Sequence, residues 1–151
     1  MNVSDLVKKH EGLRLTPYQC TEGFWTIGYG HNLDAHGEPV PEIITLAQAE
    51  DLFEMDLAVA VVQCEDLFPN WADIDEVRQA VLIDMCFNLG KQRLWKFFRM
   101  REAIGSRDWG QAAIQMEHSA WAWQTGHRAQ EDIEMMRSGE WPKGQKQGVS
   151  G

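Results

Sequence analysis

The stretch from Asp75 to Leu89 is apolar on nearly every side of a helix, and this feature constrains the fold more than any other. Its apolar residues are Val77, Ala80, Val81, Leu82, Ile83, Met85, Cys86 and Phe87. A helix without a polar face must be enclosed by other elements, and a Gly such as Gly90 directly after it is typical of a helix end. The sequence therefore predicts a buried central helix, and the rest of the chain must supply the elements around it.

Several other segments have helical patterns that can surround this central helix. Thr45-Leu-Ala-Gln48 is a capping box, and it opens a predicted helix over 45–62 with one apolar stripe. Further helices are expected at Asn2 to His10, Trp95 to Ile104, Trp109 to Glu117 and Thr125 to Ser138. At 151 residues, with 44% hydrophobic and 25% charged residues, the chain fits one globular domain.

Residues 13–29 differ from the rest of the chain because they read as β structure. Two short β-type stretches, Leu13 to Gln19 and Phe24 to Tyr29, flank the turn signal Thr21-Glu22-Gly23. The sequence therefore predicts one hairpin in a chain that is otherwise helical.

Three reactive groups gather around this hairpin. Glu11 ends the preceding helix, Cys20 stands at the turn, and Thr26 lies in the second stretch. A hairpin ladder brings Cys20 and Thr26 back towards each other. No other part of the sequence places a carboxyl, a thiol and a hydroxyl so close together.

The segment from Glu11 to His31 resembles the phage T-even-type lysozymes, which are endolysins that cleave bacterial peptidoglycan. The usual pattern of that family is Glu, then Asp or Cys, then Thr, and this chain carries the Cys variant with the ending Thr-Ile-Gly-Tyr-Gly-His. The resemblance covers nearly the whole chain. Three later segments look like the later helices of the family in order: Thr45 to Val61, Val77 to Gly90 and Trp109 to Trp141.

The predicted elements and the resemblance together indicate an α+β, lysozyme-like fold, with a small hairpin lobe and a larger helical lobe. A cleft is expected between the lobes, since such junctions are common binding sites. We expect a single domain over 1–141 and a flexible tail over 142–151. The hairpin lobe spans 13–44, the connecting helix 45–62, and the helical lobe 1–12 with 63–141.

The resemblance implies hydrolysis of the β-1,4 bond between N-acetylmuramic acid and N-acetylglucosamine, leading to host-cell lysis. Such cleavage needs a proton donor for the leaving oxygen and an opposing group that stabilises or attacks the sugar cation. Glu11 is the candidate donor. As a thiolate, Cys20 can attack the anomeric carbon or support a water molecule, and Thr26 is suited to positioning that water. Retaining and inverting outcomes both stay open.

The resemblance also implies supporting and substrate-binding residues. Arg128 matches the arginine that pairs with the catalytic glutamate, and it would hold that carboxyl or bind a substrate carboxylate. His31 and Asp56 match a salt bridge between strand and helix, which we expect to stabilise the fold. The positions that match saccharide-lining residues are Asn32, Phe87, Met100 and Gln115, with residue types that mostly differ from the family. For Phe87, core packing is an equal alternative.

The net charge of −9 argues against nucleic acid as a partner, because a phosphate binder needs a basic stripe. The charge is uneven, since residues 32–77 contain no Lys or Arg. Peptidoglycan, the predicted partner, is itself anionic, so long-range attraction does not explain its capture. We interpret the stretch as a solvated acidic face, and we expect a monomer.

The cysteines and the apolar runs indicate the cellular compartment in which the chain is expected to fold. Three cysteines without paired spacing predict no disulfide framework, which fits a reducing cytoplasm. The N-terminal segment lacks a signal-peptide core, and no run of about 20 apolar residues predicts membrane insertion. The expectation is an endolysin that waits in the host cytoplasm and reaches the wall through a membrane pore.

No cofactor and no metal site are expected. The five histidines show no ligand spacing with the cysteines, and the sequence has no glycine-rich phosphate loop.

Two other functions stay open. A thiol hydrolase of peptidoglycan peptides would use Cys20 as nucleophile and His31 as base, within hydrogen-bond distance of each other. That function leaves Glu11 unexplained. The other alternative is a non-catalytic cell-wall-binding protein, in which Cys20 replaces a lost Asp.

Overall fold

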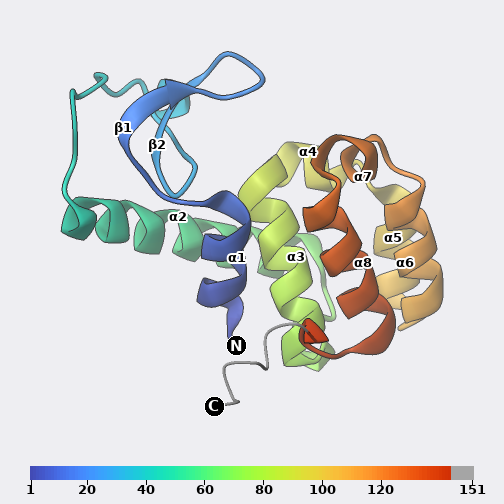
Figure 1. Cartoon of the computed structure of the whole chain (residues 1–151). Helices are drawn as coiled ribbons and strands as arrows, with labels where there is room; N and C mark the ends of the chain where they lie inside the picture. The colour runs from blue at the N-terminus through green and yellow to red at the C-terminus, as the bar shows by residue number, and fades with distance from the viewer. Residues whose placement is uncertain (144–151) are drawn as a thin grey trace. The chain divides into compact units, whose positions relative to one another are not determined.

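The computed structural model describes residues 1–143, and its fold is α+β, as the sequence predicts (Figure 1). The chain divides into two compact units. Residues Ser4 to Val59 form the hairpin unit, and the chain from Ala60 onward, with Met1 to Val3, forms the helical unit. No helix within residues 1–143 is long and apolar enough to cross a membrane.

The hairpin unit contains most of helix α1 and a small antiparallel sheet. The elements are α1 (Val3–Glu11), β1 (Arg14–Gln19), β2 (Trp25–Gly28) and β3 (His31–Asn32), with the strands in the order β1-β2-β3. Tyr18 pairs with Thr26, and the register shifts between Arg14 and Tyr18. Pro17 lies in this irregular part, which tolerates a residue without an N–H group.

Glycines set the ends of the hairpin strands. The N–H of Gly23 donates to the carbonyl of Cys20 at 2.8 Å and closes the turn between β1 and β2. Gly28 has a φ of 68°, so β2 ends before Tyr29, which the sequence predicts to lie in the strand. After β3, the short helix η1 (Asp34–His36) ends at Gly37.

Helix α2 (Leu46–Leu67) begins at the predicted capping box. The N–H of Gln48 donates to Thr45 Oγ1 at 3.1 Å, and the N–H of Thr45 donates to Gln48 Oε1 at 2.8 Å. The helix reaches Leu67 rather than residue 62, because the first helix breaker after its start is Pro69. The boundary between the two units falls inside α2.

The helical unit contains α3 (Glu76–Leu89), the buried helix that the apolar run predicts. Asp75 caps it by accepting the N–H of Arg78 at 3.2 Å, and Gly90 follows its last residue. Arg78 also donates to the carbonyl of Met136 at 2.7 Å, which ties α3 to the end of α8 (His127–Ser138).

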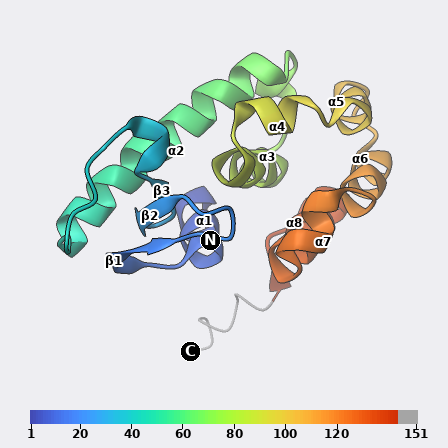
Figure 2. The ribbon, with the colours of Figure 1, turned by 90° about the horizontal axis from the view of Figure 1, so that it is seen from above.

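Shorter elements complete the helical unit. They are η2 (Trp71–Asp73), α4 (Lys91–Trp95), α5 (Phe98–Gly105), α6 (Trp109–Glu117), α7 (Ala120–Thr125) and α8. Helix α8 contacts α3, α6 and α7, and Figure 2 shows α6, α7 and α8 side by side. The bounds of α6 are those that the sequence predicts.

One predicted helix is divided, and another begins later than predicted. The sequence predicts one helix from Trp95 to Ile104, but the chain breaks at Phe97, whose φ and ψ of −79° and 62° are not helical. It also predicts a helix that starts at Thr125, but Gly126 separates α7 from α8 with a φ of 56° and a ψ of −106°. These dihedral angles interrupt the helical hydrogen bonds at both places.

Candidate active site

Glu11 is the last residue of α1, and its carboxyl lies against the backbone of Gly30. A Cβ atom at position 30 would lie 2.8 Å from Glu11 Cδ and overlap Oε1. Gly30 also has a φ of 74°, which other residues rarely adopt. Only glycine at position 30 leaves room for the Glu11 carboxyl, and the sequence analysis missed this role.

A polar network fixes α1 one turn before Glu11. Lys8 Nζ lies 2.6 Å from Glu50 Oε1 in α2, and the Tyr29 hydroxyl donates to Glu50 Oε2 at 3.1 Å. The hydrogen bond to Glu50 raises the pKa of Lys8, and the same bond lowers the pKa of Glu50. Lys8 Nζ also lies 5.0 Å from the ring centroid of Phe53. This network explains why α1 belongs to the hairpin unit, although the sequence analysis assigned it to the helical lobe.

Tyr18 is related to all three predicted catalytic residues. It pairs with Thr26 across the ladder, and Cys20 follows two residues later, directly after β1 ends at Gln19. Burial of the ring and then the negative charge of Glu11 raise the pKa of Tyr18, while the charge of Arg14 lowers it. The thiolate form of Cys20 adds a smaller increase. Tyr18 therefore pairs directly with Thr26, and its pKa depends on the charges of Glu11 and Cys20.

Cys20 and Thr26 are linked through the carbonyl of Phe24. The N–H of Cys20 and the hydroxyl of Thr26 each donate to that carbonyl at 3.0 Å. The Cys20 thiol is half-buried and forms no disulfide, whereas Thr26 is buried. Tyr18 is the direct partner of Thr26 in the ladder. Cys20, two residues after Tyr18, is therefore the diagonal neighbour of Thr26 across the hairpin.

His31 is buried between two carboxylates. Its Nδ1 lies 2.7 Å from Asp56 Oδ2, so the predicted ion pair is confirmed, and its Nε2 lies 2.8 Å from Glu38 Oε1. The hydrogen bond to Asp56 and the weaker effect of Glu38 raise the pKa of His31, against the opposing effect of burial. Since both ring nitrogens are engaged, His31 is not available as a base for Cys20.

Arg128 lies in the first turn of α8 and is held by Asp84 of α3. Its Nε donates to Asp84 Oδ2 at 3.0 Å, and its Nη2 donates to Oδ1 at 2.8 Å. Both side chains are buried, and the two parallel bonds fix the plane of the guanidinium. No sequence pattern links Asp84 to Arg128, because the two residues lie 44 positions apart in the chain. The predicted pairing of Arg128 with Glu11 stays a prediction.

Asp132 lies one turn after Arg128 and is fully buried. Among the described residues, no donor reaches either of its carboxyl oxygens. Burial and then the negative charge of Asp84 raise the pKa of Asp132 well above its ordinary value. A protonated Asp132 can donate a hydrogen bond to the Asp84 carboxylate. One of the two buried acids is then neutral, so the single guanidinium of Arg128 has only one buried carboxylate to neutralise.

The four predicted saccharide-lining residues have different surroundings. Asn32 is half-buried, and its Oδ1 accepts the N–H of Ala35 at 2.9 Å in η1. Phe87 is half-buried near the end of α3, and Gln115 lines a surface pocket formed by α5 and α6. Met100 is only 1% exposed. A side chain without accessible surface cannot contact a saccharide, so Met100 is removed from the predicted lining.

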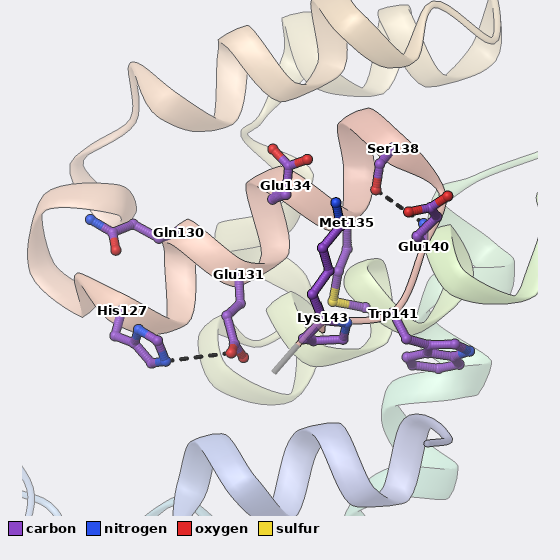
Figure 3. A pocket seen from close by; sticks show the side chains of 10 residues that line it. His127, Gln130, Glu131, Glu134, Met135, Ser138, Glu140, Trp141 and Lys143 are labelled. Carbon is purple, nitrogen blue, oxygen red and sulfur yellow. Dashed lines mark hydrogen bonds and ion pairs between the residues drawn. The ribbon is translucent and has the colours of Figure 1, made fainter. Parts of the chain in front are cut away.

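A different pocket lies along α8 and the segment after it (Figure 3). Its wall includes Glu131, Glu134, Glu140 and Trp141. His127 Nε2 lies 3.4 Å from Glu131 Oε2 on one side of the pocket. Pro142 and Lys143, where the predicted tail begins, also line it, and residues 144–151 are outside the described residues. Glu11, Cys20 and Thr26 do not line this pocket, so it is not part of the candidate active site.

Comparison with known proteins identifies the family. Residues 8–138 match the family model for phage lysozyme, and the chain belongs to that family. It is 30% identical to probable T4-type lysozyme 1 of Dictyostelium discoideum, over 91% of this chain and 95% of that protein. It is 31% identical to the pre-baseplate central spike protein Gp5 of Enterobacteria phage T4, over 85% of this chain and 26% of that protein. An endolysin of Acyrthosiphon pisum secondary endosymbiont phage 1 is 47% identical over 35% of this chain and 34% of its own length.

Proposed function

We propose that this chain hydrolyses the β-1,4 glycosidic bond between N-acetylmuramic acid and N-acetylglucosamine in bacterial peptidoglycan. Membership of the phage lysozyme family supports a lysozyme-like function. The observation that carries the specific proposal is the hairpin geometry, in which Cys20 and Thr26 share the carbonyl of Phe24 and the Glu11 carboxyl lies against Gly30. A proton donor together with a nucleophilic or water-positioning group is what glycoside hydrolysis requires.

In this proposal Glu11 donates the proton to the leaving glycosidic oxygen. Gly30 leaves space for its carboxyl, and the network around Lys8 and Glu50 holds the helix that carries it. A rigid support of this kind keeps a catalytic group in its productive geometry.

The opposing groups are Cys20 and Thr26. The Thr26 hydroxyl gives its hydrogen to the Phe24 carbonyl, so its oxygen remains an acceptor for the O–H of an attacking water. The Cys20 thiolate either assists that water or attacks the anomeric carbon, and water then releases the sugar from the sulfur. The two routes give inverted and retained products respectively.

A thiol hydrolase that cuts peptides has less support. His31 would have to act as the base, and its two ring nitrogens are bonded to Asp56 and Glu38. The carboxyl of Glu11 has no role in such a reaction.

We also propose that the chain acts as a monomeric endolysin in host-cell lysis. An endolysin is among its relatives, and the free thiol of Cys20 suits a reducing compartment. The protein would wait in the host cytoplasm and reach the wall through a membrane pore.

Digestion of purified peptidoglycan tests the proposed bond cleavage. The wild-type chain is expected to release reducing sugar ends, and Glu11→Gln is expected to slow that release at least about 100-fold, because an amide cannot donate the proton. Glu22→Gln changes an exposed acid in the hairpin turn and should retain the wild-type rate. New amino groups without reducing ends would instead support peptide hydrolysis, and neither product would indicate a wall-binding protein.

The same assay tests Cys20. Cys20→Ala is expected to lose turnover, and Cys20→Asp is expected to retain much of it, because a carboxylate can replace the thiolate. A near-normal rate in the alanine variant would remove Cys20 from the mechanism.

A further inference from the structure

Three metal-ligating side chains meet in the hairpin unit. His31 in β3, His36 in η1 and Asp56 in α2 each place one ligand atom within 4.8 Å of the others. The two imidazole rings stack with centroids 4.8 Å apart and planes 10° apart. We propose that these three residues bind a divalent transition-metal ion, with Zn²⁺ as the best match. This proposal does not depend on the proposed hydrolase function.

The local structure holds His36 over His31. Asn32 Oδ1 accepts the N–H of Ala35 at 2.9 Å, which fixes the start of the short helix that carries His36. Gly37 has a φ of 63° and ends this helix directly after His36. The position of the His36 ring beside His31 therefore follows from the backbone on both sides of His36. Because the ring planes are nearly parallel and nitrogen lone pairs lie in those planes, His36 must rotate its side chain to direct a lone pair at an ion shared with His31.

The donor set matches zinc. Two imidazoles and one carboxylate are common zinc ligands, and Zn–N and Zn–O bonds of about 2.0–2.2 Å place ligand atoms roughly 3.3 Å apart. His31 Nδ1 and Asp56 Oδ2, now 2.7 Å apart, would separate slightly as the ion replaces the proton between them. The nitrogen lone pair then binds the ion, and the proton leaves to solvent.

Glu38 supports the ligand that is most buried. Its Oε1 lies 2.8 Å from His31 Nε2, so it can hold the hydrogen on that nitrogen. A carboxylate in this position orients a zinc-bound imidazole and increases its basicity. Nδ1 of His31 is then the nitrogen that faces the ion and Asp56.

The charge of the surrounding sequence favours a cation. Residues 32–77 contain no Lys or Arg, and Asp56 and Glu38 together carry more negative charge than one imidazolium neutralises. A divalent ion balances both carboxylates. The acidic stretch, interpreted above as a solvated face, therefore gains a function. No metal site was expected from the sequence, because the spacing of the histidines was compared only with that of the cysteines. Asp56 lies in α2, 25 residues after His31, and was not part of that comparison.

Calorimetric titration of the full chain with zinc chloride tests the site. The wild-type chain is expected to bind one Zn²⁺, and His36→Ala is expected to weaken that binding at least tenfold. His36 is exposed and is not needed for the ion pair between His31 and Asp56, so the variant should keep the fold. His118→Ala removes an exposed histidine from the helical unit and should bind Zn²⁺ as the wild type does. An unchanged affinity in His36→Ala, or no binding by the wild type, would overturn the proposal.

Absorption spectra with Co²⁺ in place of Zn²⁺ distinguish the ligands. A visible spectrum typical of nitrogen and oxygen ligands, lost in His36→Ala, supports the site. The Cys20 thiol is the competing ligand in the same unit. A sulfur-to-metal charge-transfer band that disappears in Cys20→Ser would place the ion on that thiol and reject the proposal.

Discussion

In the hairpin unit, the buried His31 lies between Asp56 and Glu38, and a different ring nitrogen faces each carboxylate. In the helical unit, the buried Arg128 lies near Asp84 and Asp132, but its Nε and Nη2 both donate to Asp84. No described donor reaches the oxygens of Asp132. The first cluster pairs its carboxylates with separate donors, and the second leaves one carboxyl without a donor.

The difference follows from access to water. The side chains of Asp56 and Glu38 are 21% and 40% exposed, so water can solvate the charge that His31 does not pair. Asp84 and Asp132 are fully buried, and water is excluded from both. Asp84 accepts two hydrogen bonds from Arg128, whereas Asp132 has no described donor, so burial favours the protonated form of Asp132. A buried cation therefore does not keep every neighbouring acid ionised.

Removal of Arg128 should cause the largest loss of stability among the variants of these two clusters. Arg128→Met leaves the Asp84 carboxylate buried without its cation, and we expect unfolding free energy to fall by about 3–5 kcal/mol. Arg137→Met, on the same helix, removes an exposed guanidinium and should cost less than about 1 kcal/mol. Urea unfolding at neutral pH measures both values. Similar losses in the two variants would show that burial of the ion pair does not matter.

A smaller loss is expected in the hairpin unit. Asp56→Asn keeps the shape of the side chain but removes the charge beside His31, and should cost roughly 1–3 kcal/mol. Glu38→Gln changes the more exposed carboxylate and should cost about 1 kcal/mol or less. Urea unfolding of both variants against the wild type gives the order. A larger loss in Glu38→Gln would reverse the assigned importance of the two carboxylates.

The last expected change is a gain in stability that depends on pH. Because the folded state raises the pKa of Asp132, its proton stabilises the fold fully below the unfolded value of about 4, and this contribution is lost as pH rises through the folded value. Asn cannot lose a proton, so the stability of Asp132→Asn relative to the wild type should increase as pH rises from 5 to 8. Urea unfolding at the two pH values measures the difference. A constant difference would show that Asp132 is already ionised in the folded state at pH 5.

Features that depend on neighbouring residues were predictable from the sequence. The capping box of Thr45 and Gln48 and the apolar helix that ends at Leu89 need only residues within a few turns. The His31–Asp56 ion pair spans 25 residues, and it was predictable because the family resemblance aligned both positions. The break at Phe97 was missed, since the apolar pattern continues across it, whereas Gly126 was recognised as helix punctuation and only the start of the helix was placed two residues too early.

By itself, the amino-acid order determined the α+β class, the phage lysozyme family and the positions of Glu11, Cys20 and Thr26 around one turn. Only the folded chain decided which groups face each other. It placed the Glu11 carboxyl on Gly30 and enclosed Met100 in the interior. Caps and periodic stripes arise between residues a few positions apart. Contacts across tens of residues depend on how helices and strands pack, and no local pattern records that packing.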